Sequence, residues 1–527
     1  MTSQNADPAQ APQPGRRRLG GRQARQALRS SAPSADRQAV WRGPTGGHYR
    51  PLSDAEQGSV HRTVLNVLEN IGMAEVPDVL RDQALAQGCH QNEHGRLCFP
   101  TAFVEDMIAG AGRHFPLYGQ DPAHDIELKG KSVYFGTGGA AVRTLDVDSG
   151  RYRPSTLQDV YDFARLADAM DNVSWFTRCV VATDVTDNFG LDINTAYAIA
   201  AGTSKPIGTS FVFGEHVAPV VEMFDMMLGG QGKFAERPFC KAHISPVVSP
   251  LRYGADAFDV ALAAIQVGMP INAIIAAQAG ATAPAPPGSM LVQTVAETLA
   301  GLIMVNLFAP GYPVIFSNWP FVSDLRTGAF SGSGGEISVL NAAAAQMAHF
   351  YDLPAGVSAS MADSKVPDAQ AGYEKGISTL AAGLSGANLV YESAGMFASL
   401  LGASFEGMVI DNEMLSNVLR AVRGIEINDE ALDISVIREV VLGPGHFLGH
   451  DQTIAAMERD YYYPKLGDRT TPDDWEEQGS VEIRERGRAK ARQLLNEHFP
   501  QHVATQVDEA IRGRFDIALP AECMRFS

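Results

Sequence analysis

The stretch Asp324-Leu-Arg-Thr-Gly-Ala-Phe-Ser-Gly-Ser-Gly-Gly-Glu336 is a glycine-bearing polar loop that leads into a helix-like run ending at His349-Phe-Tyr-Asp-Leu-Pro354. After a short apolar run a second such loop follows, Ala362-Asp-Ser-Lys-Val-Pro-Asp-Ala-Gln-Ala-Gly-Tyr-Glu-Lys375. Each loop follows an apolar run and leads into a helix. Polar loops in this position form the rim of a barrel of alternating strands and helices. The stretch therefore predicts two βα units of such a barrel.

The same alternation extends through the middle of the chain. Short apolar runs, each followed by a longer segment rich in Ala, Leu and Met, lie at Val133–Phe135, Val173–Ala182, Pro206–Phe213, Phe239–Ile244, Pro270–Ala276, Pro313–Phe316, Gly356–Ala359 and Asn388–Tyr391. Strand-then-helix alternation predicts parallel strands with right-handed crossovers. Eight such units predict a (β/α)8 TIM barrel. A doubly wound open sheet is the alternative, but Gly136-Thr-Gly-Gly139 lacks the G-x-G-x-x-G spacing of its dinucleotide turn.

Both ends of the chain differ from this pattern. Residues 1–50 hold nine Arg against two Asp and are rich in Pro, Gly, Gln and Ser, which predicts a disordered basic arm. Residues 51–130 show helical periodicity around a small hairpin between Cys89 and Phe99, and predict an N-terminal helical cap. The barrel is expected over residues 131–410. Residues 411–527 predict a C-terminal helical extension that packs along the barrel or forms a subunit contact, and we expect a homo-oligomer.

The composition is that of an acidic globular protein. The formal net charge is −18, and apolar residues make up 45% of the chain. This charge argues against nucleic acid or an anionic membrane as a partner, and no uninterrupted apolar run is long enough to span a membrane. The Arg-rich start also fits an organellar transit peptide. The five scattered cysteines exclude a disulfide scaffold and fit a cytoplasmic protein.

The active site of a TIM barrel lies at the carboxyl-terminal ends of its strands. The aromatic and acidic residues expected to converge there are Phe213, Phe316, Trp319, Phe321, Tyr391, Glu215 and Glu392. This composition fits a pocket for a quaternary ammonium ion, although aromatic residues at strand ends are usually barrel plugs. His243, at the end of the fourth strand, is either a hydrogen-bonded structural residue or a ligand-binding one.

A glycine-rich loop opens one of the predicted helices. Gly332-Ser-Gly-Gly335 precedes it, and the free N–H groups of such a helix start hold an anion well. The alternative is an ordinary tight turn with Ser333 as the helix cap. No set of His, Cys, Asp and Glu has metal-ligand spacing, and no G-x-S-x-G elbow is present. The residues alone therefore predict a barrel with a polar, aromatic mouth and leave the reaction open.

Several motifs resemble those of the trimethylamine methyltransferase (MttB-like) family. They occur in order along nearly the whole chain, at Gly15–Arg29, Asn306–Pro313, Asp324–Gly328, Asp363–Lys375, Val409–Glu413 and Gly424–Glu426. The resemblance implies a (β/α)8 barrel that demethylates methylated amines and passes the methyl group to the cobalt of a separate corrinoid protein. Gln452-Thr453 departs from the family's pattern, because a histidine-threonine pair is expected near 446–459.

The absence of pyrrolysine from the sequence limits the resemblance to one branch of this family. Trimethylamine-specific members carry pyrrolysine in the barrel mouth, whereas this chain has standard residues only. It therefore resembles the non-pyrrolysine branch and its glycine betaine:corrinoid methyltransferases, which act on quaternary amines. The chain lacks Asp-x-His-x-x-Gly, the cobalamin-binding signature. We therefore expect no cofactor or metal bound by this chain, and a corrinoid (cobalamin) carried by a partner protein.

The chemistry of a quaternary amine agrees with this substrate class. Its nitrogen has no lone pair and leaves as a neutral amine, so the enzyme need only bind, orient and desolvate it. The residues expected to bind substrate are Phe213, His243, Asn318, Trp319, Arg326, Gly334, Gly335 and Tyr391, with Glu215 and Glu392 as candidate catalytic carboxylates.

In this hypothesis the residues have separate roles. Phe213, Trp319 and Tyr391 cage the trimethylammonium group, and Glu215 or Glu392 balances its charge. His243, Asn318, Arg326 or the loop amides hold a carboxylate. Direct methyl transfer to a small acceptor such as tetrahydrofolate, and a non-catalytic betaine-binding barrel, are the alternatives.

Overall fold

A computed structural model describes residues 38–524 of the 527-residue chain. Within these residues, contacts divide the chain into two compact units. The larger unit contains residues 40–424 and 464–524, and the smaller unit contains residues 425–463 with residues 38–39.

The larger unit is built on eight parallel strands, one in each of the predicted apolar runs. These are β5 (Tyr134–Phe135), β8 (Phe176–Thr177), β9 (Ile207–Thr209), β10 (Cys240–Ile244), β13 (Ile271–Ile275), β15 (Val314–Asn318), β18 (Ala355–Ser358) and β19 (Leu389–Tyr391). Their order in the sheet is β5-β19-β18-β15-β13-β10-β9-β8, and a parallel bridge between Gly136 and Trp175 joins the two ends. The sheet is thus closed, which confirms the predicted (β/α)8 barrel over the open doubly wound sheet.

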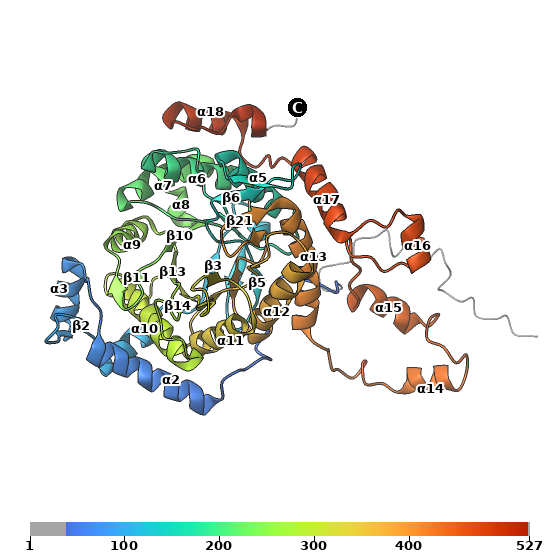
Figure 1. Cartoon of the computed structure of the whole chain (residues 1–527), viewed down its shortest axis with the longest axis horizontal. Coiled ribbons are helices and arrows are strands. Elements are labelled where there is room, and N and C mark those ends of the chain that lie inside the picture. Colours follow the sequence, from blue (N-terminus) through green and yellow to red (C-terminus); the bar gives the residue numbers. More distant parts are fainter. Residues whose placement is uncertain (1–37, 525–527) are drawn as a thin grey trace, which may run out of the picture. The chain divides into compact units, whose positions relative to one another are not determined.

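A helix follows each strand and covers the outside of the barrel. These helices are α5 (Leu157–Asp168), α6 (Asn188–Gly202), α7 (Val217–Met227) with the short α8 (Lys233–Glu236), α9 (Ala255–Val267), α10 (Pro287–Asn306), α11 (Gly335–Phe350), α12 (Ala369–Ser385) and α13 (Phe405–Arg423). Figure 1 shows α5, α6, α7, α9, α10, α11 and α12 as a ring around the strands. Each helix buries one side against the sheet, so the apolar core is continuous between the two layers.

Helix α10 is the one helix of residues 38–524 that is long and apolar enough to cross a membrane by length and composition. Of its most apolar window, 78% is buried inside the fold. Burial of this kind is typical of a core helix, and its apolar composition is explained by contacts with β13, β15 and the N-terminal helices.

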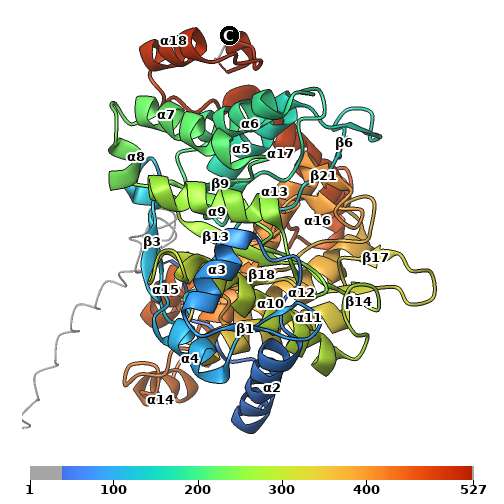
Figure 2. The same ribbon diagram turned by 90° about the vertical axis from the view of Figure 1, so that its left-hand side faces the viewer.

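The segment before the barrel packs against α10. It contains α2 (Asp54–Asn66), the π-helical turn η2 (Val67–Ile71), α3 (Asp78–Ala86), α4 (Thr101–Ala109), the 3-10 turn η3 (Pro122–His124), and the hairpins β1 (His90–Gln91) with β2 (Leu97–Cys98) and β3 (Phe115–Leu117) with β4 (Ile126–Leu128). Ser53 and Glu56 form a capping box that starts α2. The first hairpin confirms the one predicted between Cys89 and Phe99, and Figure 2 shows α3, α4 and β1 grouped on one side of the barrel.

The loops beyond the barrel strands form further short strands. These are β6 (Arg143–Leu145), β7 (Tyr152–Pro154), β11 (Val247–Val248), β12 (Arg252–Tyr253), β14 (Gln278–Ala279), β16 (Phe321–Ser323), β17 (Phe330–Ser331), β20 (Met396–Phe397) and β21 (Gly402–Ser404). Strands β20, β21, β6 and β7 form one sheet, and β14, β16 and β17 form another. Because all of them follow barrel strands, they lie on the carboxyl-terminal side of the barrel, where the sequence predicted loops only.

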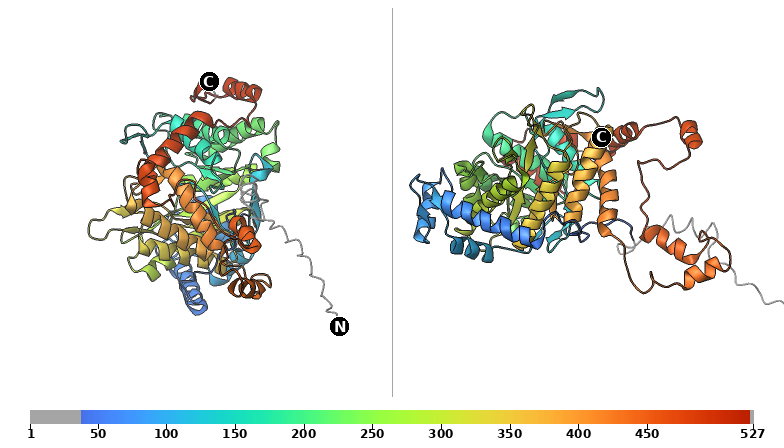
Figure 3. Two further views of the ribbon diagram at one scale, coloured as in Figure 1. Left: turned by 90° about the vertical axis from the view of Figure 1, so that its right-hand side faces the viewer. Right: turned by 60° about the horizontal axis from the view of Figure 1, so that its bottom comes forward.

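The C-terminal helices are divided between the two units. Helices α14 (Ser435–Val441) and α15 (Asp451–Arg459) belong to the smaller unit, whereas α16 (Pro472–Glu477), α17 (Ile483–Glu497), α18 (Thr505–Arg514) and the 3-10 turn η5 (Ala521–Met524) belong to the barrel unit. Helix α17 (red) lies along α13 (orange) in Figure 3. Arg484 and Arg488 each donate to the buried Glu406 over 2.8 Å and hold the two helices together.

The boundaries predicted for the segments before and after the barrel can be compared with the structure. Residue 411, the predicted start of the extension, lies inside α13. Of the predicted basic arm, residues 1–37 lie outside the described residues. Its last part contacts the barrel unit, since the amide of Gly43 donates to the carbonyl of Val133 over 3.0 Å and that of Gly47 to Leu384 over 2.8 Å.

Candidate functional site

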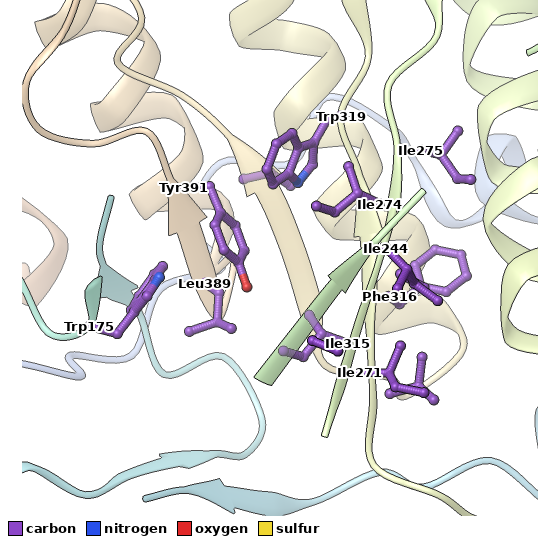
Figure 4. Close-up of a cluster of buried hydrophobic side chains, with 14 of the residues drawn as sticks. Trp175, Ile244, Ile271, Ile274, Ile275, Ile315, Phe316, Trp319, Leu389 and Tyr391 are labelled. Atoms are coloured by element: carbon purple, nitrogen blue, oxygen red, sulfur yellow. The ribbon is translucent and has the colours of Figure 1, made fainter. Parts of the chain in front are cut away.

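Three aromatic rings meet inside the barrel. Tyr391 ends β19, Trp319 directly follows β15, and Trp175 directly precedes β8. The ring centroid of Tyr391 lies 5.2 Å from that of Trp175 and 5.0 Å from that of Trp319, at interplanar angles of 64° and 43°. The rings are therefore adjoining walls rather than a flat stack. Figure 4 shows them side by side, and we call these three residues the aromatic cluster.

Strand β10 brings two basic side chains to this cluster. Successive side chains of a strand point to opposite faces, so Lys241 and His243 share the inward face. The Nζ atom of Lys241 lies 5.4 Å from the ring centroid of Trp175 and 5.7 Å from that of Tyr391. The ring of His243 lies 5.4 Å from that of Tyr391, and its Nε2 atom lies 3.3 Å from the hydroxyl of Thr177.

Several polar atoms of this region have no hydrogen-bond partner among residues 38–524. They are Nε1 of Trp175, Nζ of Lys241, Nε1 of Trp319, the hydroxyl of Tyr391 and both carboxylate oxygens of Glu392. All are buried, whereas polar groups inside proteins are nearly always hydrogen-bonded and barrel interiors are mostly branched apolar side chains. The barrel interior is therefore polar and unsatisfied, as expected of a binding site and not of a plug.

Burial shifts the ionisable groups of this site toward their neutral forms. It lowers the pKa of Lys241 to about 7 and lowers the pKa of His243 well below its usual range. Burial raises the pKa of Glu392 to about 8, against the opposing effect of Lys375, and raises that of Tyr391 well above its usual range. A charged ligand group would reverse part of these shifts, because an opposite charge favours ionisation.

The structure gathers three of the residues proposed from the sequence, namely His243, Trp319 and Tyr391. Glu392 directly follows Tyr391 in the chain and is buried, and Lys375 is the charged group that acts on its pKa. Glu392 has a positive φ of 63°, which turns the chain sharply after Tyr391. Backbone strain of this kind is concentrated at functional sites. Two further members, Trp175 and Lys241, were not predicted. The two-residue alternation of a strand could have predicted both of them. Lys241 precedes His243 by two positions, and Trp175 precedes the inward Thr177 by two.

Phe213 and Glu215 lie elsewhere. Together with Asp256 and Asp259 of α9 they line a surface cavity of about 520 Å³. The ring of Phe213 is 42% exposed and contacts His216, not the aromatic cluster. The cause is local, because the chain enters a 3-10 turn at Gly214 instead of extending β9 toward the mouth.

Asn318 and Arg326 are also separate from the cluster. Phe316 packs on Tyr351 at the end of α11, so alternation along β15 directs Asn318 to the same helix-facing side. Arg326 has a side chain that is 89% exposed, and its guanidinium donates to both carboxylate oxygens of Asp324. It lines a cavity of about 660 Å³ on the rim, which Ser331, Ser333 and Asp363 also line.

The glycine-rich loop before α11 already holds an anion of the protein itself. Asp363 accepts hydrogen bonds from the hydroxyls of Ser331, Ser333 and Ser399 and from the amide of Gly332. Burial alone would raise the pKa of Asp363, but these bonds outweigh it and lower the pKa. Ser333 is therefore not the helix cap that the tight-turn alternative required. The cap position is Gly334, which has no side chain to accept a bond.

Phe321 lies beyond the cluster on β16. Its ring centroid is 6.5 Å from that of Trp319 and 5.0 Å from that of Phe330 on β17, so it joins the cluster to the rim sheet. Within residues 38–524 no group of three His, Cys, Asp or Glu side chains is arranged to hold a metal ion.

Comparison with known proteins assigns the chain to a family. The model of the trimethylamine methyltransferase (MTTB) family matches residues 18–517. The chain belongs to the trimethylamine methyltransferase family.

Members of this family resemble the chain over most of its length. A trimethylamine methyltransferase of Desulfitobacterium hafniense is 30% identical over 463 residues, which is 88% of this chain and 92% of that protein. A glycine betaine methyltransferase of the same species is 28% identical over 466 residues, 88% of this chain and 96% of that protein. The solved structure of the Methanosarcina barkeri monomethylamine methyltransferase matches with a TM-score of 0.45 and 14% identity, over 83% of this chain and 91% of that one. As a member of the trimethylamine methyltransferase family, the chain is a methyltransferase.

Proposed function

We propose that this methyltransferase demethylates a quaternary amine, glycine betaine or a related carboxylated betaine, and that the aromatic cluster binds the trimethylammonium group. The observation that carries this proposal is the meeting of Trp175, Trp319 and Tyr391 with unpartnered, buried polar groups inside the barrel. The two compared relatives act on trimethylamine and on glycine betaine at nearly equal identity, so identity does not choose between these substrates.

The aromatic cluster suits a cation that offers no hydrogen bond. A quaternary ammonium ion is attracted by the faces of aromatic rings, and Trp has the strongest effect. A tertiary amine such as trimethylamine, once protonated, would instead present one N–H donor. In this proposal the buried carboxylate of Glu392, which directly follows Tyr391 in the chain, balances the cation. Binding of the cation would favour the ionised form of Glu392 and release its proton.

The same burial would assist the departure of the methyl group. A quaternary nitrogen is positively charged before the reaction and neutral after it, so removal from water destabilises the substrate more than the product. Trp319 is only 6% exposed and Tyr391 is fully buried, so the site excludes solvent. The role of the chain is to bind, orient and desolvate the substrate.

The methyl acceptor belongs to this proposal as well. We propose a corrinoid protein as the partner, because Asp-x-His-x-x-Gly is absent from the sequence of this chain. The cobalt of that partner, when reduced, supplies the nucleophile. Direct transfer to tetrahydrofolate and a non-catalytic betaine-binding barrel remain the competing functions, and the test separates them.

The test is a product measurement with glycine betaine, trimethylamine and choline as candidate substrates. We expect dimethylglycine to form from glycine betaine only when a reduced corrinoid protein is added, with the matching change in the corrinoid's absorption spectrum. Product formed with tetrahydrofolate and without a corrinoid protein would show that tetrahydrofolate is the methyl acceptor. Binding of betaine by calorimetry without product under any condition would identify a binding barrel, and turnover of trimethylamine alone would overturn the substrate.

A further inference from the structure

The floor of the aromatic cluster holds hydrogen-bond donors that lack an acceptor. Lys241 Nζ, Trp175 Nε1 and the Tyr391 hydroxyl are all buried without a partner among the described residues, and Lys241 lies within 6 Å of both rings. An ammonium group and an indole N–H can only donate, and a phenol donates readily. The carboxylate of Glu392 is not hydrogen-bonded to any of them, so these three donors lack an acceptor, and a ligand that satisfies them must bring one.

Lys241 differs from the other buried lysines of residues 38–524. Lys205 donates to the carbonyls of Ala167, Met170 and Val173 over 2.6 to 2.7 Å. Lys375 donates to the carbonyl of Ser360 and to the carboxylate of Asp411. Those two lysines are structural, because each is fully engaged within the fold. Lys241 has no such bond, and an unpaired buried amine is costly unless a partner arrives.

The other groups suggested for a carboxylate are less suited to this role. Arg326 is exposed and paired with Asp324, and the glycine-rich loop already holds Asp363. His243 is uncharged because burial lowers its pKa well below its usual range. It lies on the same face of β10 as Lys241, but it cannot supply the positive charge.

We propose that Lys241 binds the carboxylate of a zwitterionic substrate at the floor of the aromatic cluster, with Trp175 and Tyr391 as further donors. This proposal rests on the proposed function and adds the group that selects among quaternary amines. A betaine places its cation on the aromatic walls and its carboxylate on Lys241. Choline has no carboxylate, so it would leave these donors unsatisfied and place its cation near the Lys241 ammonium.

The charges of the site agree with this specificity. Without ligand, Lys241 and Glu392 are both buried and unpartnered, one basic and one acidic. A zwitterion carries both complementary charges, so its binding leaves the interior with no added net charge. A simple cation can satisfy only the acidic side.

The experiment is a thermodynamic cycle of two changes. One change removes the charge of the carboxylate from the ligand, and the other removes the ammonium group from the protein. Dissociation constants for glycine betaine and for its methyl ester are measured with wild type and Lys241→Met, by titration calorimetry. Wild type should bind the ester about 100-fold or more weakly than glycine betaine, the cost of leaving a buried charge unpaired. Lys241→Met should bind the two ligands within about threefold of each other. Lys129→Met, an exposed lysine, is the matched control and should behave as wild type.

The outcomes separate this proposal from the proposed function. A wild-type protein that binds ester and betaine equally well overturns the role of Lys241 even if Lys241→Met fails to fold, and leaves betaine demethylation intact. A Lys241→Met variant that keeps the wild-type preference for the carboxylate also overturns it. Absence of betaine binding by wild type would instead reject the proposed function itself.

Discussion

Trp319 is the member of the aromatic cluster nearest to solvent, at 6% exposure, and its ring adjoins Tyr391 at 5.0 Å. If the cluster binds a trimethylammonium group, Trp319→Ala removes one of its walls. We expect betaine affinity to fall by about tenfold or more, in line with the value of a desolvated cation–π contact. Titration calorimetry measures this change.

Two control variants test the role of the ring itself. Trp319→Phe should recover part of the affinity, because an aromatic face remains. Phe321→Leu, at the neighbouring ring that faces the rim sheet, should have little effect. Unchanged affinity in Trp319→Ala would exclude this residue from the site.

Glu392 permits a second test that needs no substrate. Its pKa is about 8 in the folded protein because of burial, against a usual value of 4.5. Between these values the unfolded chain has lost the proton and the folded chain retains it, so the free energy of unfolding falls as pH rises. The maximal slope is about 1.4 kcal/mol per pH unit for one group. Stability from this group is therefore full below pH 4.5 and lost as pH rises through about 8.

The neutral isostere Glu392→Gln removes this pH dependence. We expect the melting temperature of the variant minus that of wild type to increase from pH 5 to pH 8 and then to level off. Differential scanning calorimetry of both proteins at matched pH values measures it, and the effects of all other groups cancel in the difference. A difference that is constant with pH would show that Glu392 titrates normally.

Single residues differ in how far the sequence could place them. Trp319, Tyr391 and His243 could be predicted because each lies at or just after the end of an apolar run, where a barrel strand ends at the mouth of the barrel. Lys241 and Trp175 lie closer to the amino-terminal ends of their strands. Predicting them requires knowing which face of each strand points inward. Phe213 ends its apolar run equally well, but the turn at Gly214 directs it to the surface.

The strands and helices of the barrel could be predicted because short apolar runs and longer helical segments alternate along the sequence. All eight parallel strands overlap predicted runs, because a buried strand needs a continuous apolar segment and its helix a longer one. The rim strands of two or three residues, such as β16 and β17, are too short to show a period. They depend on pairing between distant loops, which one sequence does not reveal. These rim strands determine the shape of the mouth, so the outline of the site was the harder part to predict.

One ion pair connects two of the outer helices and can be tested at this scale. Lys375 of α12 donates to Asp411 of α13 over 3.0 Å, and both side chains are at most 4% exposed. Lys375→Met leaves Asp411 as an unpaired buried carboxylate. The free energy of unfolding should fall by about 3–5 kcal/mol.

The double variant Lys375→Met with Asp411→Leu removes both charges. It should lose less stability than Lys375→Met alone, because no uncompensated charge remains. Urea unfolding monitored by circular dichroism measures wild type, Lys375→Met, Asp411→Leu and the double variant, because the coupling between the two residues requires all four proteins. Additive effects of the two substitutions would show that the pair is not coupled in the folded protein.

At the scale of the whole molecule, the two units differ in how they use apolar side chains. The barrel unit buries them in one continuous core. The smaller unit instead exposes large apolar side chains at Ile425, Ile427, Leu432, Ile434, Ile437, Val441, Leu442, Phe447, Leu448, Tyr461 and Tyr463. An exposed apolar surface of this extent marks an interaction site. The homo-oligomer predicted from the sequence stays a prediction, and this surface is where we expect its subunit contact.

The oligomer is tested by placing charges on that surface. Leu442 and Leu448 are 81% and 78% exposed, so Leu442→Glu with Leu448→Glu leaves the fold of the barrel intact and opposes burial of this segment in a subunit contact. Sedimentation velocity should give more than the monomer mass for wild type and a smaller assembly for the double variant. Val79→Glu, at an apolar residue of α3 that is 59% exposed, is the control and should keep the wild-type mass. A wild-type monomer, or a double variant with the wild-type mass, would contradict a homo-oligomer formed through this surface.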